Sequence, residues 1–196
     1  MIISVMNFKG GVGKSTISFN IAKHFGLKMV TNDKYSALSN IKQTTGGGSI
    51  NIKDNRLYDF GGFEDKRAAE VLASSDVIVV PTLYSRADIQ NTVLSVRYIL
   101  KASANANIVV VINRVRSGDD KVLNEVKEQL NKHIKHNVQY VTLRDSKAML
   151  RSINEQKTIF DIHKSSGLSR HVYAPLVNDF FMIVSAIEHF GEEVEE

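Results

Sequence analysis

The sequence predicts an α/β fold in which a mostly parallel, twisted sheet is covered by helices on both faces. Short runs that are apolar at every position alternate along the chain with longer amphipathic patterns of helical period. Strands that are apolar throughout are typical of parallel sheets buried on both sides. The 196 residues are 43% hydrophobic and 23% charged, as expected of a soluble globular protein. We therefore expect residues 1–196 to form a single domain.

The first strand and the first helix enclose a glycine-rich loop. Residues 2–6 are rich in β-branched side chains and predict a strand. Residues 15–25 predict a helix, because apolar side chains recur every four positions and a glycine ends the pattern. A second strand is expected over residues 27–31. The chain thus begins with a strand–loop–helix–strand unit.

The remaining elements continue this alternation. Residues 32–48 are polar and end in three glycines, which favours a loop with at most one short helix. Apolar runs then predict strands over residues 49–53, 56–60, 77–81, 108–113 and 138–143. Amphipathic patterns predict helices over residues 65–74, 86–102, 121–135, 147–155 and 175–190. Right-handed crossovers would place the loops that follow the strands along one edge of the sheet, where ligands bind in such folds.

The composition excludes several kinds of site. Because the chain has no cysteine, it has no disulfide framework, thiolate zinc site or cysteine-held iron–sulfur cluster. Its histidines lack the H-E-x-x-H spacing of a zinc protease, and no G-x-S-x-G nucleophile motif occurs. Neither a signal peptide nor an apolar stretch of about 20 residues, the length that spans a bilayer, is present. We expect a cytoplasmic protein without a membrane partner.

The segment MNFKGGVGKST, residues 6–16, carries the strongest functional pattern. Its glycines would let successive backbone N–H groups point inward, while the following helix directs its N-terminal dipole at the same point. Together they would form a cradle for the phosphates of a nucleotide. Lys14 would add a cation at the β- and γ-phosphates, and Ser15 a hydroxyl ligand for Mg²⁺. The predicted nucleotide-binding residues of this segment are Lys9, Gly10, Gly11, Val12, Gly13, Lys14, Ser15 and Thr16.

One position departs from the standard pattern G-x-x-x-x-G-K-[ST]: Phe8 stands where the first glycine is expected, and an extra lysine, Lys9, follows it. The resulting K-G-G-x-G-K-S resembles the deviant Walker A motif of the ParA/MinD family of P-loop ATPases. The resemblance implies a P-loop fold and hydrolysis of ATP with Mg²⁺. It also implies that Lys14 acts in its own site, whereas Lys9 reaches the nucleotide of the other subunit in a dimer. Such a cation would couple chemistry to assembly, as an arginine finger does. The alternative for Lys9 is a solvated surface lysine.

Further segments match the family in the same order over nearly the whole chain. VTNDKY, residues 30–35, stands where the family has D-x-D-x-Q. Asp33 matches the second aspartate and is implied to position the attacking water, making it a catalytic residue with Lys9 and Lys14. Thr31 and Tyr35 replace the first aspartate and the glutamine, which points to slow hydrolysis.

Two more strand ends complete the implied site. LYDFGG, residues 57–62, resembles the family's Walker B and switch segment, so Asp59 is implied to contact Mg²⁺ through water, and the glycines to sense the γ-phosphate. Asn113, which ends VVVIN, is implied to read adenine. Ordinary turn chemistry is the alternative explanation for residues 31–35 and for Asn113.

The net charge of +4 is unevenly distributed: +3 over residues 1–96, +7 over residues 97–170 and −6 over residues 171–196. A basic segment is typical of a polyanion partner, although lysines spaced over a solvated surface give the same excess. Our candidate DNA contacts are Arg144, Lys147 and Arg151, which we expect near the start of one helix on a shared face. The acidic C-terminal segment would be repelled by anionic lipid.

These features predict a small ATPase that resembles plasmid-type ParA partition proteins and lacks an N-terminal helix-turn-helix. It would dimerise on ATP, bind DNA nonspecifically in the nucleoid, and segregate or position DNA cargo. A centromere- or cargo-binding adaptor protein would stimulate its hydrolysis. Two alternatives stay open: a MinD-like membrane-associated positioning ATPase and a metabolic ATP-dependent ligase of the same fold.

Overall fold

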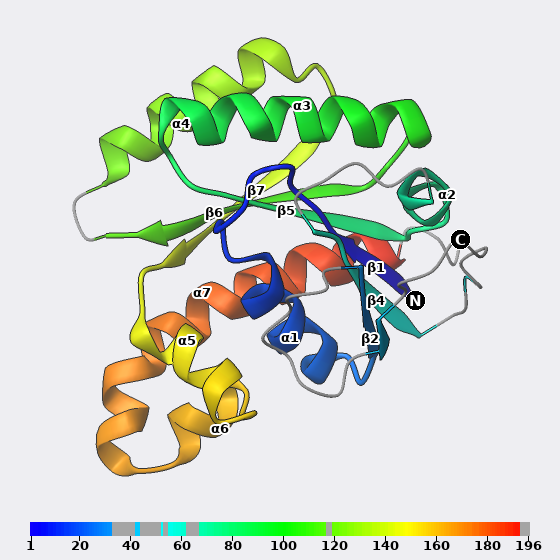
Figure 1. Cartoon of the computed structure of the whole chain (residues 1–196). Coiled ribbons are helices and arrows are strands. Elements are labelled where there is room, and N and C mark those ends of the chain that lie inside the picture. Colours follow the sequence, from blue (N-terminus) through cyan, green and yellow to red (C-terminus); the bar gives the residue numbers. More distant parts are fainter. Residues whose placement is uncertain (33–41, 44–51, 53–54, 62–66, 117–118, 193–196) are drawn as a thin grey trace.

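The computed structural model describes residues 1–32, 42–43, 52, 55–61, 67–116 and 119–192. Within these residues the strands form a seven-stranded parallel sheet in the order β3-β2-β4-β1-β5-β6-β7 (Figure 1). The strands are β1 (Ile2–Val5), β2 (Lys28–Thr31), β3 (Lys42–Gln43), β4 (Arg56–Asp59), β5 (Val77–Thr82), β6 (Ile108–Val115) and β7 (Val138–Arg144). The predicted parallel α/β architecture is confirmed.

Helices cover both faces of this sheet, as Figure 1 shows. One layer consists of α1 (Lys14–His24), α5 (Lys147–Asn154), α6 (Ile159–Lys164) and α7 (Gly167–Glu192). The other layer consists of α2 (Ala68–Ala73), α3 (Arg86–Ala102) and α4 (Asp120–His133). Each layer therefore shares a separate apolar core with one side of the sheet.

The strands supply both cores, because successive side chains of a strand point to opposite faces. In β5, Val77 and Val79 pack in the core beneath α1 and α7, whereas Ile78 and Val80 pack beneath α3 and α4. All four side chains are completely buried. Burying one such side chain is worth about 1.5–3 kcal/mol relative to leaving it exposed. This two-sided burial explains why the strands are apolar at every position.

The structure departs from the expected elements in three short segments. β3 lies within a segment expected to be a loop, and α6 was not expected at all. Its start is marked by a reciprocal cap, in which Thr158 and Asp161 each accept a hydrogen bond from the other's backbone N–H. β6 extends two residues beyond its predicted end and contains a register shift between Asn113 and Val115. Most of the strand expected over 49–53 lies outside the described residues.

The C-terminal helix begins earlier than the predicted range of 175–190. Helix α7 starts at Gly167 and contains Pro175 in its interior. A proline has no N–H to donate to the carbonyl four residues earlier, so the helix loses one hydrogen bond there. Leu176, Phe180 and Ile183 are buried against the sheet, and this packing offsets the loss. Neither α7 nor another helix in the described part of the chain is long and apolar enough to cross a membrane.

Candidate functional site

The glycine-rich loop joins β1 to α1 at the carboxyl edge of the sheet (Figure 1). Gly13, immediately before the helix, has a φ of 96°, in the left-handed region that side chains with a Cβ rarely adopt. A Cβ added to Gly13 would also overlap the side-chain amide nitrogen of Asn113. The loop therefore requires glycine here for two independent reasons.

Lys14 is the first residue of α1 and is 92% buried, since its relative exposure is 8%. Its Nζ donates a hydrogen bond to the backbone carbonyl of Lys9 at 2.9 Å. This contact folds the ammonium back across the glycines, so that the cation lies over the loop rather than in bulk water. The structure thus provides the fixed positive charge that a phosphate cradle requires.

The start of the loop is anchored by Asn7, which the sequence analysis did not identify. The Asn7 side chain is completely buried. Its Oδ1 accepts from the N–H of Lys9 at 2.8 Å, while its Nδ2 donates to the Pro81 carbonyl at 2.8 Å. The next N–H, of Phe8, donates to Ser95 Oγ at 2.9 Å. The loop is therefore tied to β5 and to α3, and the position of Asn7 directly after a strand was its only signal in the sequence.

Asn113 anchors the other end of the loop from β6. Its Nδ2 donates to the Val12 carbonyl at 2.9 Å, and its Oδ1 accepts from the N–H of Arg114 at 2.8 Å. The side chain is 6% exposed. Both ends of the amide thus bond to backbone here, and a role in reading adenine stays a prediction.

Asp59 ends β4 beside α1 and is 2% exposed. Its Oδ1 accepts a hydrogen bond from Ser18 Oγ at 3.0 Å, and its backbone carbonyl accepts from Thr31 Oγ1 at 2.9 Å. Thr31, the residue in place of an aspartate, therefore braces the strand end that carries Asp59. Asn32 continues this bracing, because its Oδ1 accepts from the N–H of Gly61 at 2.6 Å.

A cavity of about 300 Å³ joins these groups. The described residues that line it come from the loop, from the start of α1, from the end of β4 and the residues after it, and from β6: Gly10, Gly11, Gly13, Lys14, Ser15, Thr16, Asp59, Phe60, Gly61 and Arg114. The structure thus brings Lys14, Ser15 and Asp59 together as predicted. Val12 is completely buried, and neither it nor Lys9 lines the cavity. Asp33, Tyr35 and Gly62 lie outside the described residues.

The oxygen groups of this cavity fit a magnesium ion. Mg²⁺ is usually held by one or two carboxylates, by substrate phosphates and by water. Ser15 supplies a hydroxyl and Asp59 a carboxylate to the same cavity. The described residues contain no cluster of three or more histidine, cysteine or acidic side chains that could hold a metal by themselves. A bound ion would therefore depend on the phosphates of a ligand.

A second cavity, of about 260 Å³, adjoins the first and shares Gly13, Thr16 and Arg114 with it. Its other described lining residues are Asn113, Arg144 at the end of β7, Asp145 and Ser146 in the turn that follows, and Lys147, Met149 and Leu150 at the start of α5. The two cavities therefore adjoin each other between the glycine loop and the end of β7.

The three candidate DNA contacts are not arranged as expected. Arg144 is the last residue of β7 rather than part of a helix, whereas Lys147 and Arg151 lie on α5. Arg144 donates two side-chain hydrogen bonds to Asp179 of α7, at 2.7 and 2.9 Å. These bonds raise the pKa of Arg144 above its ordinary value. The prediction of a shared helical face is wrong for Arg144, because the strand continues to that residue and α5 begins after its Ser146 cap.

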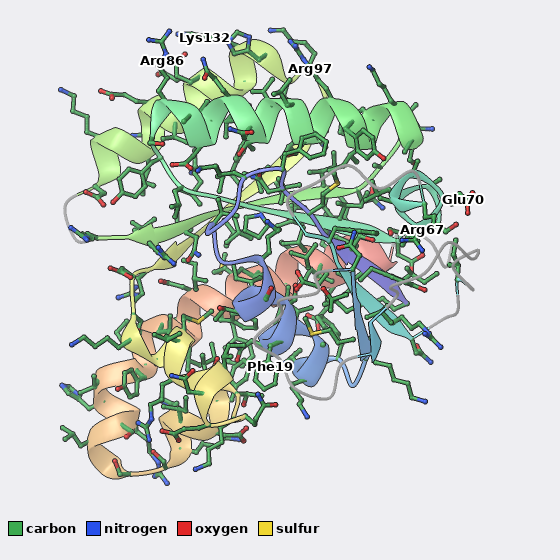
Figure 2. All side chains as sticks on the ribbon, in the orientation of Figure 1. Phe19, Arg67, Glu70, Arg86, Arg97 and Lys132 are labelled. Atoms are coloured by element: carbon green, nitrogen blue, oxygen red, sulfur yellow. The ribbon has the colours of Figure 1, made fainter. Side chains whose placement is uncertain are left out.

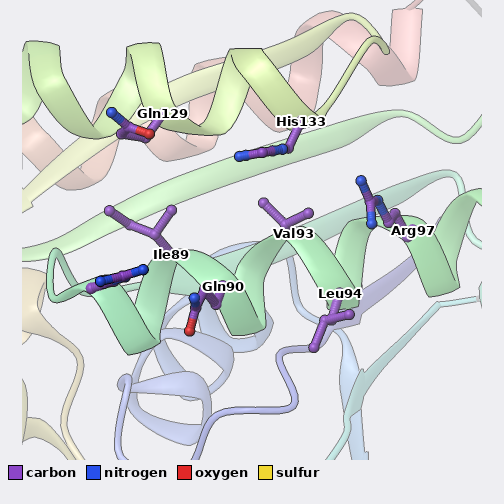
Figure 3. Close-up of a pocket in the computed structure, with 8 residues that line it drawn as sticks. Ile89, Gln90, Val93, Leu94, Arg97, Gln129 and His133 are labelled. Atoms are coloured by element: carbon purple, nitrogen blue, oxygen red, sulfur yellow. The ribbon is translucent and has the colours of Figure 1, made fainter.

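A larger cavity than these two, of about 790 Å³, lies elsewhere, between α3 and α4 (Figure 3). It is lined by apolar side chains of α3, by Gln129 and His133 of α4, and by Arg86 and Arg97. Figure 2 shows these two arginines on the outer side of α3, in the helix layer opposite α1. No residue of the glycine loop lines this groove, whereas the two smaller cavities are lined by most of the nucleotide-binding candidates.

Comparison with known proteins agrees with this geometry. The profile described as the CobQ/CobB/MinD/ParA nucleotide binding domain matches residues 3–159. A search of curated protein sequences finds no significant match.

Solved structures share the fold at low sequence identity. McdA from Cyanothece, without ligand, superposes with a TM-score of 0.68 at 12% identity, over 95% of this chain and 98% of that one. A ParA family ATPase from Chlorobium tepidum superposes with a TM-score of 0.63 at 14% identity, over 90% of this chain and 98% of that one. The MinD cell division protein of Aquifex aeolicus superposes with a TM-score of 0.61 at 16% identity, over 94% of this chain and 96% of that one.

Proposed function

The chain belongs to the CobQ/CobB/MinD/ParA nucleotide binding domain family, and from that premise we propose that it is a slow, Mg²⁺-dependent ATPase. The observation that carries the proposal is the cavity that joins Lys14, Ser15 and Asp59. A buried ammonium, a helix N-terminus and left-handed glycines all face the same space. This arrangement complements a polyphosphate rather than a neutral ligand.

In the proposed site, Lys14 balances the charge of the β- and γ-phosphates. Ser15, and Asp59 through water, would hold Mg²⁺, which supplies charge neutralisation to the phosphates when bound. Asp33 is proposed to orient the attacking water, and Lys9 to act on the nucleotide of a second subunit. The Ser18 hydrogen bond keeps one oxygen of the Asp59 carboxylate fixed in direction.

We further propose that the ATP-bound protein is a homodimer that binds DNA without sequence preference and positions DNA cargo with an adaptor protein. The support is the net charge of +7 over residues 97–170. A two-fold dimer contains this basic segment twice. Counterion release makes affinity rise steeply with the number of phosphate contacts. The acidic segment over residues 171–196 disfavours an anionic membrane as the partner.

Residues 1–196 are proposed to act as one domain. Helix α7 lies entirely beyond the stretch that matches the family profile. Its Leu176 and Phe180 nevertheless pack in the same core as Ile3 and Val5 of β1. The helix and the strand that precedes the glycine loop would therefore unfold together.

Calorimetric titration with Mg-ATP tests the nucleotide site. The parent protein should bind, and Lys14→Ala should abolish binding, because the phosphates lose their main cation. Lys23→Ala is the matched control, since Lys23 lies exposed on the same helix. Undiminished affinity in Lys14→Ala, or no affinity in the parent protein, would refute the proposed function.

A further inference from the structure

Arg114 has an unusual backbone geometry and lies where the cavity at the glycine loop adjoins the cavity toward β7. It lies in the register shift of β6, where Asn113 pairs with Leu143 and Val115 with Arg144, so that Arg114 is an extra residue. Its φ is 58°. Left-handed φ values are uncommon for residues other than glycine, and arginine is not among the residues enriched there. Irregular residues of this kind often redirect a side chain beside an active site.

The redirected side chain is placed between two cavities. Arg114 lines both the cavity at the glycine loop and the cavity that leads toward β7. Among the described residues, only Gly13 and Thr16, at the start of α1, share this double placement. Of the described residues common to both cavities, Arg114 is therefore the one with a charged side chain.

Arg114 also differs from its basic neighbours in its partners. Arg144 forms a salt bridge with Asp179, and Nε of Arg116 lies 3.9 Å from Oδ2 of Asp145. For the exposed guanidinium of Arg114, no ion pair or side-chain hydrogen bond is found within the described residues. With a left-handed φ, an exposed side chain and no ion-pair partner among the described residues, Arg114 is available to bind an anion where the two cavities adjoin.

We propose that Arg114 is a nucleotide-binding residue whose guanidinium contacts the α-phosphate. This inference rests on the proposed function, which places the terminal phosphates at Lys14, and it adds that the nucleoside occupies the adjoining cavity toward β7. The α-phosphate is then the charged group that lies where the cavities meet. A guanidinium binds such a group through paired charge-assisted hydrogen bonds. Because AMP, ADP and ATP all carry an α-phosphate, Arg114 stabilises all three alike.

The experiment replaces Arg114 with glycine, which removes the guanidinium and adopts a φ of 58° without strain. Titration of Arg114→Gly should show an affinity about tenfold weaker for both ATP and ADP, as expected for loss of one charge-assisted contact. The melting temperature of the ligand-free protein should stay level or rise by up to about 2 °C, since strain is relieved. Arg114→Asn, which also tolerates this conformation, serves as the second variant if the glycine variant does not fold.

Two controls separate the contributions of strain and charge. Gln156→Gly relieves a comparable φ of 53° after α5, and Lys121→Ala removes an exposed charge on α4. Neither residue lines the two cavities, so both variants should bind ATP and ADP like the parent protein.

The possible outcomes are distinct. Parent-like affinity for both nucleotides in Arg114→Gly would show that the guanidinium does not contact the nucleotide and that the register shift affects only the backbone of β6. A weaker affinity for ATP together with an unchanged affinity for ADP would place the guanidinium at the γ-phosphate instead. Either result overturns the assignment while leaving the proposed function intact. A parent protein that binds no ATP would instead refute the proposed function itself.

Discussion

Gly13 and Asn113 lie in direct contact across 100 positions of sequence, because the Asn113 amide occupies the space where a Cβ on Gly13 would stand. From this position the amide donates to the Val12 carbonyl at 2.9 Å. The end of β6 thus closes the loop that follows β1. The contact is possible only while residue 13 has no side chain.

Gly13→Ala should therefore displace Asn113 and strain the backbone. We expect the free energy of unfolding to fall by about 2–3 kcal/mol, from the left-handed φ and the lost hydrogen bond together, and nucleotide binding to be lost. Thermal and urea unfolding without ligand measures the first effect. Gly10→Ala is the control, because nothing lies within 4 Å of a Cβ at that position. Equal stability of the two variants would contradict the described packing.

Lys9→Ala should keep nucleotide binding but lose ATP-dependent dimerisation and most hydrolysis. The groups of Lys9 that shape the loop are its N–H, bonded to Asn7, and its carbonyl, bonded to Lys14. Alanine retains both, so the substitution removes the side chain beyond Cβ and leaves these backbone bonds in place. Light scattering with a nonhydrolysable ATP analogue measures the dimer, and Lys28→Ala, at an exposed lysine on β2, is the control. A normal dimer with normal turnover would show that Lys9 is a surface lysine.

DNA binding should appear with ATP, be weak with ADP, and decrease steeply with salt. Arg151→Glu tests the basic surface, since Arg151 lies on α5 away from both cavities and pairs only with Glu155 among described acidic groups. We expect the slope of log affinity against log salt to shrink by about 2, because each of the two subunits in the dimer loses one phosphate contact. Lys132→Glu, on α4, applies the same charge change elsewhere. An unaltered mobility shift in Arg151→Glu would exclude this residue, and salt-independent binding would exclude the electrostatic mechanism.

The cap of α6 predicts a pH effect on stability. Hydrogen bonds from Thr158 lower the pKa of Asp161 below its ordinary value. The contribution of the ionised Asp161 carboxylate to the free energy of unfolding is therefore complete above the unfolded-state pKa, near 4. This contribution is lost as pH falls through the folded-state pKa. Asp161→Asn should reduce the free energy of unfolding by about 0.5–1 kcal/mol at pH 7, and this difference should shrink as pH falls through the lowered folded-state pKa of Asp161. Glu128→Gln on α4 controls for loss of an exposed carboxylate. A difference that does not shrink as the solution is acidified would contradict the assignment.

The sequence predicted the local parts of the fold well, because those parts depend on short-range patterns. Helix α3 begins at Arg86 and ends at Ala102 as expected, since its apolar stripe and its Ser85 cap lie within one segment. The short helix α6 and the early start of α7 were missed. In α7 the burial of residues such as Phe180 offsets the hydrogen bond lost at Pro175, and such burial is visible only once the sheet is assembled.

By itself the sequence determined that a strand, a glycine loop and a helix follow one another with Lys14 and Ser15 at the helix start, because backbone torsion and helix initiation are local properties. Tertiary structure alone decided which hydrogen bonds hold that loop and the residues around it. Asn7 bonding to β5, Ser18 bonding to Asp59 and Arg114 bordering both cavities all join segments far apart in the chain or depend on strand register. No residue pattern specifies these contacts in advance, since each arises from the order and stagger in which parallel strands are packed side by side.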